Sequence, residues 1–129
     1  MGISAARGLF QVAFHVAGSA AANLSFKWTA PCDMTLLHVS AVGSNDGDAT
    51  MTVGDSDDAD EYLASFAVGD SGTPVEKDGD DFLDTDGNSH NAYYPRIADG
   101  TVVAIAVDFD GDGGTAVDDL TIVLTLAPD

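Results

Sequence analysis

The sequence predicts an all-β fold, a single-domain antiparallel β-sandwich of about eight strands that is jelly-roll-like. Short apolar runs alternate with polar residues, as in strands with one buried face. Asp-Gly pairs, which suit tight turns, recur between those runs, and no long amphipathic helix is visible. A chain of 129 residues is long enough to bury one hydrophobic core. We expect residues 1–8 to form a flexible N-terminal arm and residues 9–129 to form the sandwich domain.

The first half of the chain contains four alternating segments that predict strands: Leu9–Ala17, Leu24–Trp28, Met34–Val42 and Ala49–Val53. The next segment, Asp57–Phe66, is ambiguous. Its apolar residues Tyr62, Leu63 and Phe66 fit one helical turn, behind a cap at Ser56 or Asp57.

The second half begins with a turn at Asp70–Pro74 and a short polar strand that reaches Lys77. An acidic loop then leads to a predicted strand at Asn91–Ile97. The most strongly apolar runs follow, Thr101–Phe109 and Leu120–Ala127, and both alternate with a period of two. We expect these two runs to be paired strands joined by a Gly/Asp-rich hairpin loop.

The charge balance limits the possible partners. Twenty-two Asp and Glu residues stand against four Lys and Arg, giving a formal net charge of -18. Nucleic acid binding requires clustered cationic side chains, and an anionic membrane repels such a surface. We therefore expect neither partner. Aspartate-rich, lysine-poor chains are typical of salt-adapted organisms, in which salt screens the self-repulsion.

The cysteine content and the distribution of apolar residues also limit the possible sites and locations of the protein. Cys32 is the one cysteine, so the sequence offers no intrachain disulfide and no cysteine-based metal motif. The sequence shows no classical signal peptide and no apolar stretch long enough to span a membrane. We expect a protein that stays in the cell or leaves it within an assembly.

The clearest candidate site is the loop between the last two apolar runs. Asp108, Asp110 and Asp112, with Gly113, form a D-x-D-x-D-G pattern, and Asp119 lies where a calcium loop places its last carboxylate. This pattern predicts a Ca²⁺ or Mg²⁺ site. The alternative is a solvated acidic loop, because an EF-hand needs flanking helices and a longer glutamate at that last position. A weaker second candidate combines Asp84, Asp86 and Asn88.

Other motifs favour structural roles. Gly69-Asp70-Ser71-Gly72 resembles the nucleophile motif of serine proteases, but a turn fits better because no matching histidine context exists. The histidines lie on separate segments without zinc spacing, and no carboxylate pair stands out as an acid and base. We expect no enzyme activity and no required cofactor.

Two stretches resemble small virion structural proteins of tailed viruses, of the capsid decoration or cement type. They are VGDSDDADEYLASFAVGDSGTP (Val53–Pro74) and IADGTVVAIAVDFDGDGGTAVDDLTIVLTL (Ile97–Leu126). The resemblance extends over most of Leu9–Ala127 and rests on a pattern rather than on a diagnostic motif. The acidity suggests a virus of a halophilic or marine host.

The resemblance implies a non-enzymatic jelly-roll module, assembled in the host cytoplasm, on the outer surface of the virion capsid. It implies binding to major capsid protein subunits as a homotrimer. Arg7 and Arg96 are candidate interface residues, since arginine pairs well with acidic groups at interfaces. The alternative function is a calcium-dependent carbohydrate- or receptor-binding β-sandwich module of a tail, fibre or extracellular protein.

Overall fold

The computed structural model describes residues 8–83 and 94–129, and these ranges contain no helix. They form nine strands: β1 (Phe10–Ser19), β2 (Leu24–Thr29), β3 (Met34–Val42), β4 (Thr50–Asp55), β5 (Leu63–Ala67), β6 (Val75–Lys77), β7 (Arg96–Ile97), β8 (Val102–Asp108) and β9 (Asp118–Pro128). The predicted all-β class is therefore confirmed. The proposed arm, residues 1–8, lies almost wholly outside the described residues and stays a prediction.

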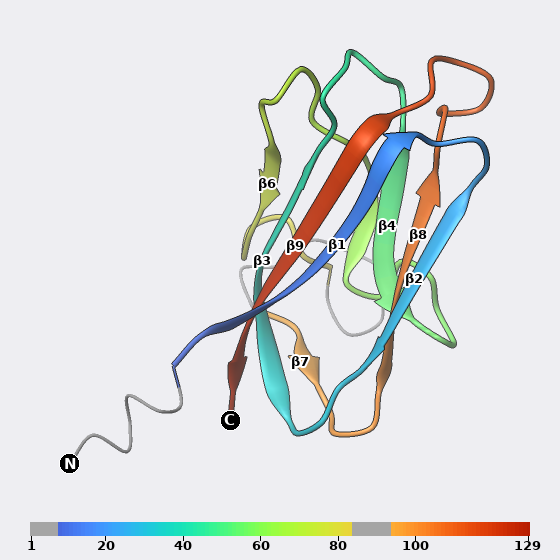
Figure 1. Cartoon of the computed structure of the whole chain (residues 1–129). Helices are drawn as coiled ribbons and strands as arrows, with labels where there is room; N and C mark the ends of the chain where they lie inside the picture. Colours follow the sequence, from blue (N-terminus) through green and yellow to red (C-terminus); the bar gives the residue numbers. More distant parts are fainter. Residues whose placement is uncertain (1–7, 84–93) are drawn as a thin grey trace.

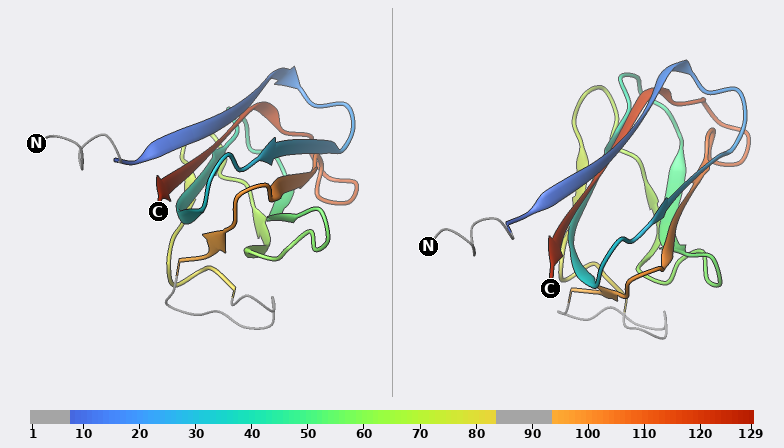
Figure 2. Two further views of the ribbon diagram at one scale, coloured as in Figure 1. Left: turned by 90° about the horizontal axis from the view of Figure 1, so that it is seen from below. Right: turned by 60° about the horizontal axis from the view of Figure 1, so that its bottom comes forward.

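The strands form two sheets packed face to face (Figures 1 and 2). One sheet has the order β1-β9-β3-β6, with β7 also paired to β3, and the other has the order β2-β8-β4-β5. The strand pairs are antiparallel and nested: β1 with β9, β2 with β8, β3 with β6, and β4 with β5. Such nesting is what a long hairpin gives when it is rolled into two sheets. The topology is that of a jelly roll.

The core lies between the two sheets and is built from the alternating residues predicted to be buried. In β9, Leu120, Ile122, Leu124 and Leu126 are each at most 1% exposed. They face the inward side of β8, where Ile105 is 1% exposed. Burial of these side chains supplies the main force that holds the sheets together.

A β-bulge in β3 allows two residues that are three positions apart to face the core. The register with β9 shifts between Leu36 and His38. Leu36 and Val39 consequently both point into the core. His38 stays outside, where its Nε2 lies 3.2 Å from Oε1 of Glu76 on β6. The bulge thus keeps an ionisable group out of the apolar interior.

The last two long strands do not form the expected hairpin. β8 lies between β2 and β4 in one sheet, whereas β9 lies between β1 and β3 in the other. The loop that joins them therefore crosses from sheet to sheet at one end of the sandwich (Figure 1). The prediction of paired strands was wrong because alternation identifies a buried face and not the neighbour in the sheet.

The ambiguous segment after β4 is a turn followed by strand β5. Oδ1 of Asp55 accepts hydrogen bonds from the N–H groups of Asp57 and Asp58, as a helix cap would. No helix follows, because the Tyr62 N–H donates to the Val53 carbonyl and returns the chain to β4. Gly54 permits this close return, since a Cβ there would lie 2.1 Å from the Asp58 carbonyl oxygen.

Candidate functional site

The predicted cation loop lies at one end of the sandwich, the same end as the β3–β4 and β5–β6 loops (Figure 1). Backbone hydrogen bonds join the three loops: the Asp48 N–H donates to the Thr115 carbonyl at 2.8 Å, and the Ser71 N–H donates to the Asn45 carbonyl at 3.0 Å. This end of the molecule gathers acidic residues from segments that are distant in the sequence. We call it the acidic end.

Within the loop, aspartates bind the backbone that follows them. Oδ1 of Asp108 accepts a hydrogen bond from the Asp110 N–H at 3.4 Å. Oδ1 of Asp110 accepts from the N–H groups of Asp112, at 3.2 Å, and Gly113, at 3.1 Å. These are Asx turns, in which a short carboxylate takes the place of a backbone acceptor. The D-x-D-x-D-G spacing therefore explains the tight bend even without a bound ion.

Asp119, the fourth predicted ligand, lies on β9 and faces the end of β1 and the β3–β4 connection. Its Oδ1 accepts from the Gly18 N–H at 2.8 Å and its Oδ2 accepts from the Ser44 hydroxyl at 2.9 Å. These two hydrogen bonds lower the pKa of Asp119, with a smaller contribution from His15. The residue adopts a φ of 49°, a conformation that Asp tolerates better than most residues.

The structure does not bring the four carboxylates into one ligand shell. Among residues 8–83 and 94–129, no group of three or more His, Cys, Asp or Glu side chains is placed to hold a metal ion. The second candidate, Asp84, Asp86 and Asn88, lies outside the described residues. The Ca²⁺ or Mg²⁺ site at Asp108, Asp110, Asp112 and Asp119 stays a prediction.

Two side chains of the β3–β4 loop hold the β8–β9 loop in place. Oδ2 of Asp48 accepts from the Thr115 N–H at 2.7 Å. Asn45 accepts from the Asp118 N–H and donates to the Ala116 carbonyl, both at 2.9 Å. These contacts provide hydrogen-bond partners for backbone groups of the β8–β9 loop, which crosses between the sheets. The conformation of the loop is therefore fixed by its contacts with the rest of the fold.

Close carboxylates at the acidic end and near β5 shift each other's ionisation. A side-chain hydrogen bond with Asp70, together with its charge, raises the pKa of Asp46. The same interaction between Asp58 and Asp60 lowers the pKa of Asp58 and raises that of Asp60. Such shifts arise where like charges are held close together, so these sites store electrostatic repulsion.

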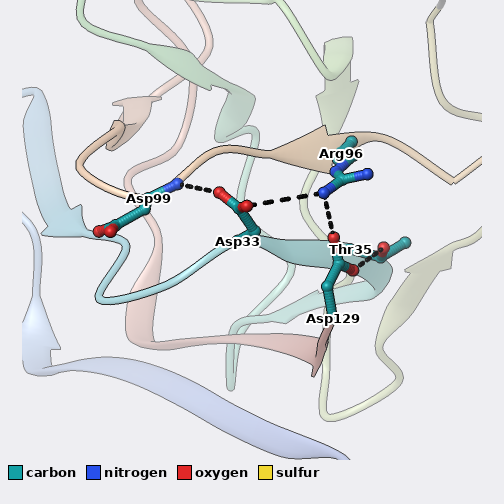
Figure 3. A network of polar contacts seen from close by, with 5 residues as sticks. All are labelled: Asp33, Thr35, Arg96, Asp99 and Asp129. Carbon is teal, nitrogen blue, oxygen red and sulfur yellow. Dashed lines mark hydrogen bonds and ion pairs between the residues drawn. The ribbon is translucent and has the colours of Figure 1, made fainter.

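The candidate interface residue Arg96 lies at the opposite end, in a network of polar contacts (Figure 3). Its guanidinium lies 2.5 Å from Oδ2 of Asp129 and 3.7 Å from Oδ2 of Asp33. Asp33 also accepts from the Asp99 N–H at 2.8 Å, and the Thr35 hydroxyl donates to Asp129 at 3.4 Å. The Arg96 side chain is 64% exposed, so it is accessible although two carboxylates already balance its charge. Arg7, the other candidate, lies outside the described residues.

The remaining motifs take structural roles. The Gly69–Gly72 segment forms a turn, in which Ser71 has a φ of 50° and the Gly72 N–H donates to the Gly43 carbonyl. His15 lies on β1, with Nδ1 2.9 Å from the Thr121 hydroxyl oxygen, and His38 contacts Glu76. His90 lies outside the described residues.

One surface that no sequence motif indicates is the side of the sandwich where β1 and β2 lie. Two ring pairs join the inward faces of these strands: Phe10 with Trp28, centroids 6.1 Å apart, and Phe14 with Phe26, centroids 5.1 Å apart. All four rings are only partly buried. The alternation of both strands was visible in the sequence, but it did not show that they form one open side.

Comparison with known proteins gives a structural relationship only. No known protein family matches the chain, and no curated protein matches its sequence. A chain described as the cyanophage Pam1 capsid asymmetric unit has a similar structure, with a TM-score of 0.54 and 17% sequence identity. The match covers 95% of this chain and 84% of that chain. What the two share is the fold.

The described residues contain no helix that is long and apolar enough to span a bilayer.

Proposed function

We propose that this chain is a non-enzymatic structural protein of a virion, which decorates or cements the outer surface of a capsid. The observation that carries the proposal is the jelly-roll topology, matched over 95% of the chain by a chain of a cyanophage capsid asymmetric unit. Fold alone does not define a function, so the role must be tested directly.

The proposed partner is the major capsid protein, which this chain would contact as a homotrimer. A decoration protein works by presenting surfaces to neighbouring subunits, and a rigid two-sheet sandwich is well suited to this. Arg96 is the described residue that we propose for contact with an acidic group of the capsid. Its exposure allows such a contact, and a bidentate arginine–carboxylate pair gives geometric specificity.

The test is co-sedimentation of the full chain with capsids assembled from the major capsid protein encoded in the same genome. We expect saturable binding at a fixed ratio to capsid subunits, in a high-salt buffer that screens non-specific charge effects. An unrelated acidic protein of similar size is the control and should stay in the supernatant. Absence of binding to intact capsids at every salt concentration would refute the proposal.

Arg96→Ala addresses the proposed contact. Because exposed ion pairs contribute about 0–1 kcal/mol, this variant should remain folded. We expect weaker capsid binding with a nearly unchanged melting temperature. Calcium-dependent glycan binding by a monomer, without capsid binding, would instead favour the carbohydrate-binding alternative.

A further inference from the structure

The acidic residues are distributed unevenly along the chain. All 22 Asp and Glu residues lie at or after Asp33, so neither β1 nor β2 carries one. The charged or titratable side chains of these two strands are His15 and Lys27, and both residues are exposed. In a chain of net charge -18, the carboxylate of Asp119 on β9 contacts the end of β1 at the Gly18 N–H, but β1 and β2 supply no acidic residue to the side that they form. We call it the β1–β2 edge, defined by Phe10–Ser19 and Leu24–Thr29.

Both strands are also the outermost strands of their sheets. Within residues 8–83 and 94–129, β1 pairs only with β9 and β2 pairs only with β8, so each has one backbone edge that no described strand covers. β1 is 10 residues long and contains neither proline nor a residue with a formal charge. Soluble proteins normally protect such an edge with charge, proline or short length, because an unpaired strand readily pairs with another chain.

The opposite edge of the β1 sheet has that protection. β6 has 3 residues, of which Glu76 and Lys77 are charged. β7 has 2 residues and includes Arg96. β5, at the opposite edge of the β2 sheet, has no charged residue and no proline. The contrast therefore singles out β1 as the edge that another chain covers, and the ring pairs place β2 next to it.

Leu9 and four partly buried aromatic rings lie on the same side. The ring pairs Phe10–Trp28 and Phe14–Phe26 close the sandwich only partly. Leu9, which precedes β1, is 65% exposed. The other large exposed hydrophobic residue of the described ranges, Tyr94, precedes β7 and packs against Phe82. An apolar stripe with aromatic residues and little charge has the composition of an interface core.

We infer that the β1–β2 edge is the surface through which copies of this chain associate with one another. Two bodies of charge -18 repel strongly wherever their acidic surfaces approach. Contact between acid-free edges keeps the acidic ends apart, and it covers both the unpaired strands and the aromatic rings. Three such edges can meet around a threefold axis, as the proposed trimer requires. The inference rests on the charge distribution and the strand order, so it does not depend on the capsid role.

The test adds acid to this edge. In the double variant Ala13→Asp with Ser25→Asp, both substituted residues are exposed, one on β1 and one on β2. The matched control is Ser65→Asp with Ala67→Asp, which makes the same changes at exposed positions of β5, the opposite edge of the β2 sheet. Light scattering after gel filtration in high-salt buffer gives the mass of each. We expect the parent and the control to be oligomers and the β1–β2 variant to be a monomer with an unchanged circular dichroism spectrum.

Leu9→Asp gives a second measurement that does not disturb a strand. We expect it to weaken association, and to make the fluorescence of Trp28, the one tryptophan of the chain, more accessible to a soluble quencher. A parent that is monomeric at all concentrations would overturn the inference, as would an oligomer that both edge variants leave intact. A monomeric parent that still binds capsids would overturn self-association alone, and leave the virion role standing.

Discussion

Individual carboxylates in this protein have opposite effects on the folded state. Asp119 accepts hydrogen bonds from Gly18 and Ser44, and these contacts favour its charged form. Asp46 lies against Asp70, which disfavours its charged form. Both residues are on the surface, and burial is not the largest cause of either pKa shift. The decisive factor is whether the neighbouring group donates a hydrogen bond or carries a like charge.

Asp119→Asn should lower stability at neutral pH. The folded pKa of Asp119 lies below its ordinary value of 3.8, so its contribution is present above that value and is lost as the pH falls through the folded pKa. The melting temperatures of parent and variant should therefore differ at pH 7 and converge in acid. Asparagine retains the tolerance for positive φ, which leaves charge as the main change. A difference independent of pH would contradict this account.

Asp46→Asn should have the opposite effect. Because folding raises the pKa of Asp46, the charged carboxylate destabilises the folded protein above that folded pKa. Removing the charge should raise the melting temperature at pH 7, and the gain should shrink as the pH falls. Measuring this variant in parallel with Asp119→Asn provides a matched pair with opposite signs. Destabilisation by both variants would show that local packing outweighs charge here.

At the level of strands, the alternation of apolar residues predicted where strands lie in the sequence, but it did not predict which strands pair in a sheet. β3 was expected at Met34–Val42 and is found there, because its inward residues had to be apolar. Alternation did not reveal the bulge at Leu37, since the bulge depends on how β9 aligns with β3. It also could not place β8 and β9 in different sheets, because two strands that face each other across a core show the same pattern as two neighbours.

The candidate cation site was predicted only in part for a related reason. The turn chemistry of Asp108 and Asp110 is local, so the spacing correctly indicated a tight acidic bend. The position of Asp119 depends on the distant residues Gly18 and Ser44, which the spacing does not contain. The contacts of Asn45 and Asp48 with this loop were likewise not detectable as a motif.

Calcium titration tests the loop between β8 and β9. If Asp108, Asp110 and Asp112 bind the ion, the melting temperature of chelator-treated protein should rise with Ca²⁺ as a saturable function of concentration. Sodium chloride at matched ionic strength is the control, and Asp110→Asn should abolish the rise. If Ca²⁺ gives no shift beyond that control, the loop is a solvated acidic turn.

Across the whole molecule, acidic residues are concentrated in the loops and at the ends of strands. The acidic end brings the β3–β4, β5–β6 and β8–β9 loops together, and hydrogen bonds fix them there. Their repulsion is a property of the folded state, since unfolding lets these charges separate.

Stability should therefore increase with salt. The screening length falls from about 10 Å at 0.1 M to about 3 Å at 1 M ionic strength, which weakens repulsion within the acidic end. We expect the melting temperature to rise over this range of sodium chloride. A β-sandwich of similar size and near-zero net charge, melted in parallel, measures the effect of salt that does not depend on charge. An equal rise in both proteins would show that self-repulsion is unimportant.

The nested pairing of strands also determines when the protein can fold. Phe10 lies opposite Leu126, so β1 leaves the ribosome long before its partner β9 has been made. Contacts between such distant segments make folding slow, on the order of milliseconds to seconds for β-sandwiches. Throughout most of synthesis, β1 has no partner, although it contains neither proline nor a formally charged residue to hinder pairing with another chain. Until β9 emerges, we expect pairing of β1 with a strand of another nascent chain to compete with correct folding.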